Sequence, residues 1–129
     1  MKSWIWVDLR EILSMHADQI AEHGGLHGVR DQGLLESALS RPKNLLAYGD
    51  PGPFELAAAY AFGIARNHPF VDGNKRSAFL ASASFLAWNG WELTAAETDV
   101  VIVFQDLAAG NLNEPELAVW FERHSKRIS

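Results

Sequence analysis

The sequence of 129 residues contains no cysteine, which excludes disulfide bonds, thiolate metal sites and thiol nucleophiles together. It also lacks any apolar run close to the roughly 18 residues that a membrane span needs. The N-terminus has one lysine and only a brief apolar stretch before its first acidic residues, so a signal peptide is not expected. These absences predict a soluble, cytoplasmic protein.

A surplus of basic residues is missing as well, because the formal net charge at pH 7 is -5. Proteins that bind nucleic acid broadly usually present a basic face, so the composition argues against direct nucleic-acid binding. One short segment differs, since Arg66, Lys75 and Arg76 lie in a window whose only acid is Asp72. A cationic spot on an acidic protein indicates a small anionic ligand.

The apolar residues predict a core, and no repeat or linker divides the chain, so we expect one domain over residues 1–129. Asp8, Thr94 and Asn113 each precede a Glu by three residues, which is the pattern of a capping box at a helix start. Spacing and punctuation predict helices at about 9–23, 32–40, 54–67, 74–88, 95–109 and 114–126.

The breaks between these helices carry their own predictions. Pro42 is expected just beyond the second helix, and residues 47–53 are expected to form a loop because Pro and Gly interrupt them repeatedly. Residues 91–94 predict a short strand that could pair with residues 3–7, since both segments are aromatic or β-branched. The expected fold class is therefore all-α, with at most a minor short β pairing.

Residues 66–78, RNHPFVDGNKRSA, fall in a turn before a helix that begins near Asn74. A helix N-terminus offers unpaired backbone amides and a partial positive charge, which suit an anion. Gly73 has no Cβ to block a bound group, and Asn74 can cap the helix or donate an amide hydrogen to a phosphate. Lys75 and Arg76 oppose the helix dipole, which a bound anion would explain.

Two residues of this segment carry groups suited to chemistry. Asp72 provides a hard oxygen ligand. Mg²⁺ is usually bound by one or two such carboxylates together with substrate phosphates. His68 can accept the proton of a hydroxyl nucleophile, because histidine exchanges protons near neutral pH. We expect Phe70 to anchor the loop in the core. Together, the base, the metal ligand and the anion site predict phosphoryl or nucleotidyl transfer. The alternative is a simple connection between two helices, whose charged side chains face water.

The segment resembles the signature of the Fic/Doc superfamily, His-x-Phe-x-Asp/Glu-Gly/Ala-Asn-Gly/Lys-Arg. The matching residues are His68, Phe70, Asp72, Gly73, Asn74, Lys75 and Arg76. Residues 23–44, 56–70 and 85–93 also look like the Doc branch, the death-on-curing toxins of toxin-antitoxin modules. The resemblance covers essentially the whole chain and implies a single-domain helical Fic fold with the motif between two central helices.

Typical Fic enzymes transfer AMP. The resemblance therefore implies AMP transfer here, with His68 as the base and Asp72 as the Mg²⁺ ligand. Lys75, however, stands where a second Gly is usual, and Ser77 to Phe79 provide no later Arg. Both departures are Doc features, and they imply that ATP binds the other way round and gives its γ-phosphate to the target. The implied catalytic residues are His68, Asp72, Lys75 and Arg76, and the implied nucleotide-binding residues are Arg66, Gly73, Asn74, Lys75 and Arg76.

The resemblance also implies partners. The target would be a threonine hydroxyl of elongation factor Tu, whose phosphorylation halts translation, and the inhibitor would be a separate antitoxin of the Phd type. No Glu is followed by Gly or Asn, so the inhibitory helix of self-silencing Fic proteins is not expected. Transfer of AMP and a non-catalytic regulatory module remain alternatives.

Two further features receive predictions. The loop GGLHGVRD, residues 24–31, would correspond to the flap that helps to position the target, although a Gly-rich helix cap explains its glycines equally well. His16 lies on the apolar side of the first helix, so we expect it to hydrogen-bond within the core.

Overall fold

The computed structural model of the chain describes residues 3–128, which form six helices and one two-stranded sheet. The helices are α1 (Leu9–His23), α2 (Gln32–Ala47), α3 (Pro53–Asn67), α4 (Asn74–Trp88), α5 (Glu97–Ala109) and α6 (Glu114–Arg123). The strands are β1 (Trp91–Leu93) and β2 (Ser125–Arg127). The fold class is all-α with a minor β pairing, as predicted. No helix within residues 3–128 is long and apolar enough to cross a membrane.

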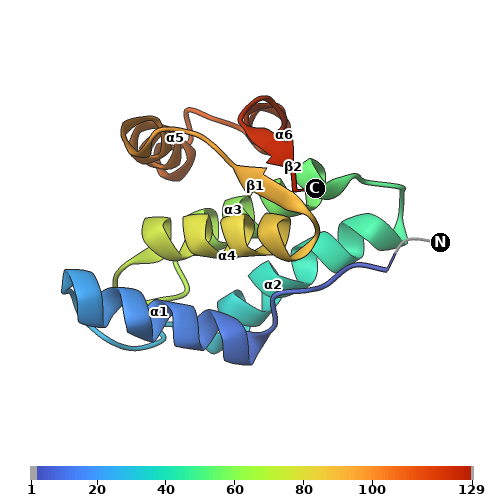
Figure 1. The fold of residues 1–129 in the computed structure, drawn as a ribbon. Coiled ribbons are helices and arrows are strands. Elements are labelled where there is room, and N and C mark those ends of the chain that lie inside the picture. The colour runs from blue at the N-terminus through green and yellow to red at the C-terminus, as the bar shows by residue number, and fades with distance from the viewer. Residues whose placement is uncertain (1–2, 129) are drawn as a thin grey trace.

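Helix α3 supplies much of the core, because apolar side chains surround it. Buried residues run without a break from Leu56 to Ala61, and Gly63, Ile64 and Ala65 are buried as well. A helix that is apolar on all sides needs partners on all sides. Helices α2, α4 and α6 pack against α3, while α1 and α5 pack against α4. Figure 1 shows α4 between α1 and α5, with the motif connection at its N-terminal end.

Two of the three predicted capping boxes are present. The Asp8 side chain accepts from the Glu11 N–H at 3.0 Å, and Asn113 begins α6 in the same way. Thr94 does not cap α5, because its N–H and its hydroxyl both donate to the His124 carbonyl, at 2.6 and 2.9 Å. The N-cap of α5 is Ala96. A long-range contact with the end of the chain therefore replaces the local cap.

Helix α2 is longer than predicted, and Pro42 lies inside it. A proline within a helix removes the hydrogen bond to the carbonyl four residues earlier, here that of Ala38. Packing against α3 compensates for this loss, since Pro42 and Leu39 are buried. The missing side chain of Gly63 permits the close approach, because a Cβ there would lie 3.1 Å from the Ala38 Cα. The helix continues to Ala47, and the following loop is shorter than expected.

The strand predicted at residues 91–94 forms over Trp91–Leu93, but its partner is the end of the chain. β1 pairs antiparallel with β2, and Glu92 lies opposite Lys126. Helix α6 therefore ends at Arg123 instead of residue 126, because the residues that follow are taken into the sheet.

Residues 3–7, the predicted partner of β1, form an extended segment whose backbone groups bond to side chains. Asn89 accepts from the Ile5 N–H at 2.9 Å and donates to the Ile5 carbonyl at 2.9 Å. The Tyr60 hydroxyl bonds to the N–H and carbonyl of Val7 at 3.0 and 3.1 Å. Burial raises the pKa of Tyr60 to about 12, so the hydroxyl keeps its proton. Side chains thus take the place of a neighbouring strand for the backbone groups of Ile5 and Val7.

Candidate active site

The connection between α3 and α4 begins at His68, whose backbone is strained. His68 has φ 48° and ψ 54°, and it is the only non-glycine residue with positive φ between residues 3 and 128. This position after a helix usually holds glycine, and a side chain there costs about 1 kcal/mol. His68 is nevertheless exposed, so packing of a buried side chain does not explain its strained backbone. Strain at an exposed histidine is typical of functional sites.

Phe70 anchors the connection in the core, as predicted. Its buried ring stacks on the imidazole of His16 from α1, with the ring centroids 3.9 Å apart. The Nε2 of His16 lies 2.8 Å from the Asp72 carbonyl oxygen, to which it donates a hydrogen bond. His16 is buried, which confirms the prediction that it hydrogen-bonds within the core.

Asn74 closes the connection by bonding to the backbone of Phe70. Its Oδ1 accepts from the Phe70 N–H at 2.9 Å, and its Nδ2 donates to the Phe70 carbonyl at 3.0 Å. The N-cap of α4 is Gly73, so Asn74 does not cap the helix. The amide braces the loop instead. The predicted contribution of Asn74 to phosphate binding would therefore come chiefly from its backbone N–H.

Replacing Asn74 with alanine is expected to lower the free energy of unfolding by about 3 kcal/mol, because two buried backbone groups of Phe70 lose their partners. Chemical denaturation followed by circular dichroism measures this loss. Asn111→Ala is the matched control, since Asn111 is exposed and its replacement should change stability by less than about 0.5 kcal/mol. Equal effects of the two substitutions would refute the proposed brace.

Backbone N–H groups hold the exposed carboxylate of Asp72. Its Oδ2 accepts from Leu26 at 3.1 Å and its Oδ1 from Gly73 at 2.9 Å. These bonds, that from Leu26 first, lower the pKa of Asp72 below the ordinary value of 3.8. Gly25 permits the approach, because a Cβ there would lie 2.7 Å from Oδ2. Asp72 is therefore ionised at neutral pH, as a Mg²⁺ ligand must be.

A groove of about 1090 Å³ opens between α1, the connection, the start of α4 and α5. The predicted site residues that line it are His68, Asp72, Gly73, Asn74, Lys75 and Arg76. Apolar side chains, among them Phe79, Val100 and Phe104, form another part of its wall. The structure thus places the candidate base, the candidate metal ligand and a helix N-terminus in one cavity of ligand-binding size.

Charge is distributed unevenly around this groove. Lys75 and Arg76 are exposed in the first turn of α4, and within residues 3–128 neither forms an ion pair. That turn contains no acid, although acids are favoured there. The wall from α1 carries Asp18 and Glu22. An anion is therefore favoured on the α4 side, where both cations reinforce the positive end of the helix dipole.

Arg66, the remaining predicted site residue, is not part of the groove wall. Its guanidinium lies over the Phe62 ring, 5.6 Å from the centroid. It also lies beside the C-terminal end of α5, where a Cβ on Gly110 would be 3.3 Å from Nη1. A helix C-terminus favours a cation, which gives Arg66 a structural explanation. Its contact with a phosphate stays a prediction.

Sequence reasoning missed how residues 24–31, here called the strap, hold the connection. Arg30 donates from Nε to the His68 carbonyl at 2.7 Å and from Nη2 to the Asn67 carbonyl at 2.8 Å. The Val71 N–H donates to the Gly28 carbonyl at 3.0 Å. The available signal was the glycine pattern of this loop, whose three glycines all have positive φ. The loop predicted to act on the target thus binds the motif itself.

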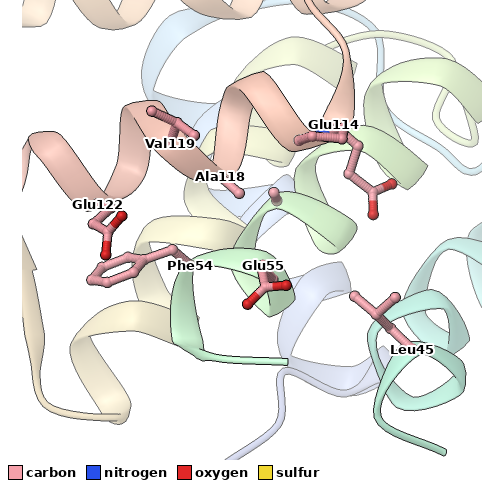
Figure 2. Close-up of a pocket in the computed structure, with 9 residues that line it drawn as sticks. Leu45, Phe54, Glu55, Glu114, Ala118, Val119 and Glu122 are labelled. Atoms are coloured by element: carbon pink, nitrogen blue, oxygen red, sulfur yellow. The ribbon is translucent and has the colours of Figure 1, made fainter. Parts of the chain in front are cut away.

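A smaller cavity, of about 440 Å³, lies between α3 and α6 and is lined by none of the motif residues (Figure 2). Glu55, Glu114 and Glu122 border it. Glu55 accepts from the Gly52 N–H at 2.9 Å, and Glu114 pairs with Arg41 at 2.6 Å. A helix cap and a surface ion pair explain these two carboxylates. The larger groove is therefore the candidate active site.

The sequence of the chain matches that of known proteins. The model described as the Fic/DOC family matches residues 6–86, a span that contains α1, the strap and the whole motif. This span is more than half of the sequence, and the chain belongs to the Fic/DOC family.

Within that family the chain falls in the Doc toxin branch. It is 43% identical over 97 residues to "Toxin Doc" of Mycolicibacterium smegmatis (strain ATCC 700084 / mc(2)155), which covers 74% of this chain and 72% of that protein. It is 37% identical over 81 residues to "Protein kinase doc" of Escherichia phage P1, which covers 62% of this chain and 64% of that protein.

Proposed function

We propose that the chain is a Doc-like toxin that transfers the γ-phosphate of ATP to a threonine hydroxyl of a translation factor and so arrests translation. Elongation factor Tu is the target that the resemblance to Doc implies. One observation carries the proposal: His68, Asp72 and the cationic first turn of α4 line the same groove. The name of the phage P1 relative, a protein kinase, supports the same reaction.

His68 would act as the general base. As the target hydroxyl attacks the γ-phosphorus, its proton passes to the imidazole and the new O–P bond forms. The bond between the γ-phosphorus and the bridging oxygen breaks, and ADP leaves with that electron pair. His68 is exposed at the start of the connection between α3 and α4, which makes it accessible to a protein substrate.

Asp72 would hold Mg²⁺, and its exposed, ionised carboxylate fits this ion. When bound, the ion neutralises charge on the phosphates of ATP. Gly73 leaves the approach to the helix N-terminus open, and the backbone N–H groups of the first turn can donate to phosphate oxygens. Lys75 and Arg76 would offset the remaining negative charge.

Lys75 supports transfer of phosphate over transfer of AMP. A glycine at this position would leave room for a phosphate, whereas a lysine brings a long side chain and a positive charge. By resemblance to Doc, ATP would then present its γ-phosphate to the target. The alternative is an AMP transferase, which the intact set of His68, Asp72, Gly73 and Asn74 would also serve.

ATP labelled on either the α- or the γ-phosphate separates these two reactions. The protein is incubated with a translation extract and each label, and His68→Ala protein in the same extract is the control. We expect the γ-label alone to appear on a target protein, and to be absent with the variant. Label from the α-phosphate on the target would show AMP transfer instead.

A toxin of this kind also needs an inhibitor, and we propose a separately encoded antitoxin of the Phd type. The likeness to Doc toxins implies this partner. A disordered antitoxin segment would fold as it binds, and the cost of ordering would moderate its affinity. Relief of growth arrest by co-expression of the candidate antitoxin tests the pairing.

A further inference from the structure

The backbone of His68, the proposed base, adopts a conformation that is unfavourable for a histidine. Its φ of 48° lies in the left-handed region. Such residues persist where the surrounding structure determines their conformation. Within residues 3–128 no hydrogen bond or ion pair to the His68 side chain is present. The restraint must therefore act on the backbone.

Arg30 supplies that restraint from the strap. Its Nε donates to the His68 carbonyl at 2.7 Å, and its Nη2 donates to the Asn67 carbonyl at 2.8 Å. Its backbone N–H donates to the next carbonyl, that of Pro69, at 2.7 Å. One residue thus binds three successive carbonyls at the C-terminal end of α3. The positive guanidinium suits the partial negative charge of this end.

The contact requires arginine in particular. Two donors of the planar guanidinium reach two neighbouring carbonyls at once, in a geometry that the rigid fork defines. A lysine presents a single ammonium on a flexible stem and cannot reproduce the fork. Rotation of His68 out of the left-handed region would move its carbonyl away from Nε, so the fork selects the observed backbone.

Arg30 itself does not line the groove, so its effect on the site would pass through the backbone of His68, which does. The same strap also holds the candidate metal ligand, because the Leu26 N–H donates to the Asp72 carboxylate. We propose that Arg30 is a positioning residue for phosphoryl transfer, which fixes the His68 backbone so that the imidazole faces the target hydroxyl. This inference rests on the proposed function.

The kinetic test compares Arg30→Ala with Arg41→Ala in phosphate transfer. Arg41 is a surface arginine of α2 that pairs with Glu114, so it is a matched control. Arg30→Ala should lower kcat by about 100-fold, the effect of a misplaced catalytic group, and leave the Kd for ATP nearly unchanged. Methylguanidinium added to Arg30→Ala should restore part of the lost kcat. The kcat of Arg30→Lys should stay below that of the wild type. Weaker ATP binding at unchanged kcat, or equal loss in Arg41→Ala, would overturn the proposal.

A second measurement does not need a target protein. In histidine-labelled protein, the NMR signals of His68 report the order of its imidazole, and they are assigned with a His68→Gln variant. Arg30→Ala should shift and broaden these signals, whereas Arg41→Ala should not. Unchanged His68 signals in Arg30→Ala would overturn the positioning role. If the wild type transfers no phosphate, the proposed function fails separately, and this spectrum still decides whether Arg30 holds His68.

Discussion

His68→Ala is expected to abolish growth arrest on expression and to lower phosphate transfer by about 10²- to 10⁴-fold, the range that a general base contributes. The reason is that the imidazole of the proposed base, which lines the groove at the end of α3, would be removed. His23→Ala is the matched control, because His23 also lines the groove but belongs to α1 and lies 3.7 Å from Glu22. Growth arrest and transfer of γ-label are the measurements.

A stability measurement separates this functional role from a structural one. Glycine adopts φ 48° without strain, so His68→Gly should raise the free energy of unfolding by about 1 kcal/mol while activity is lost. Loss of activity together with loss of stability would indicate a structural histidine. If His68→Ala left growth arrest unchanged, the non-catalytic regulatory module would become the better interpretation.

Asp72→Ala is expected to remove the Mg²⁺ dependence of ATP binding and to lower phosphate transfer by at least about 100-fold, since the phosphates lose their charge stabilisation. Titration calorimetry with ATP, with and without Mg²⁺, measures the first effect. Asp18→Ala is the control, because Asp18 lines the same groove from α1. A variant at Asp72 that still binds ATP in a Mg²⁺-dependent way would assign the ion to other residues.

The pH dependence of this site has a defined sign. The N–H groups of Leu26 and Gly73 lower the pKa of Asp72 in the folded protein below 3.8. A group with a lowered pKa contributes stability above its unfolded pKa and loses that contribution as the pH falls through the folded pKa. Asp72 therefore stays ionised throughout the neutral range. A loss of activity just below neutral pH would have to come from another group.

Local chemistry made much of the helical structure predictable from the sequence. Asp8 and Asn113 form capping boxes with residues three positions later, and Gly24 ends α1. The start of α4 near Asn74 was predicted from the turn residues that precede it. These signals act within one helical turn, so they hold where no distant contact competes with them, as one does at Thr94.

The errors arose where a distant segment decided the outcome. Pro42 stays within α2 because burial against α3 offsets a lost hydrogen bond. Thr94 bonds to His124, and residues 3–7 bond to Asn89 and Tyr60. In each case a residue far away in the sequence satisfies a polar group or a face, and no local pattern encodes which residue that will be.

The candidate site was predictable in part. The motif lies in one short stretch, so His68, Asp72 and the first turn of α4 could be predicted to lie together. The brace from Asn74 to Phe70 and the fork from Arg30 could not, because they concern which backbone groups the side chains reach. Sequence chemistry named the candidate site residues, whereas the structure shows what holds them in place.

If the proposed function is correct, one phosphate, and not AMP, passes from ATP to a protein hydroxyl. The most direct test is the intact mass of purified elongation factor Tu after incubation with this protein, ATP and Mg²⁺, followed by location of the modified residue. We expect a gain of a single phosphate on a threonine, absent with His68→Ala. A gain of AMP, or an unchanged mass of elongation factor Tu after incubation with active protein, would contradict the proposed function.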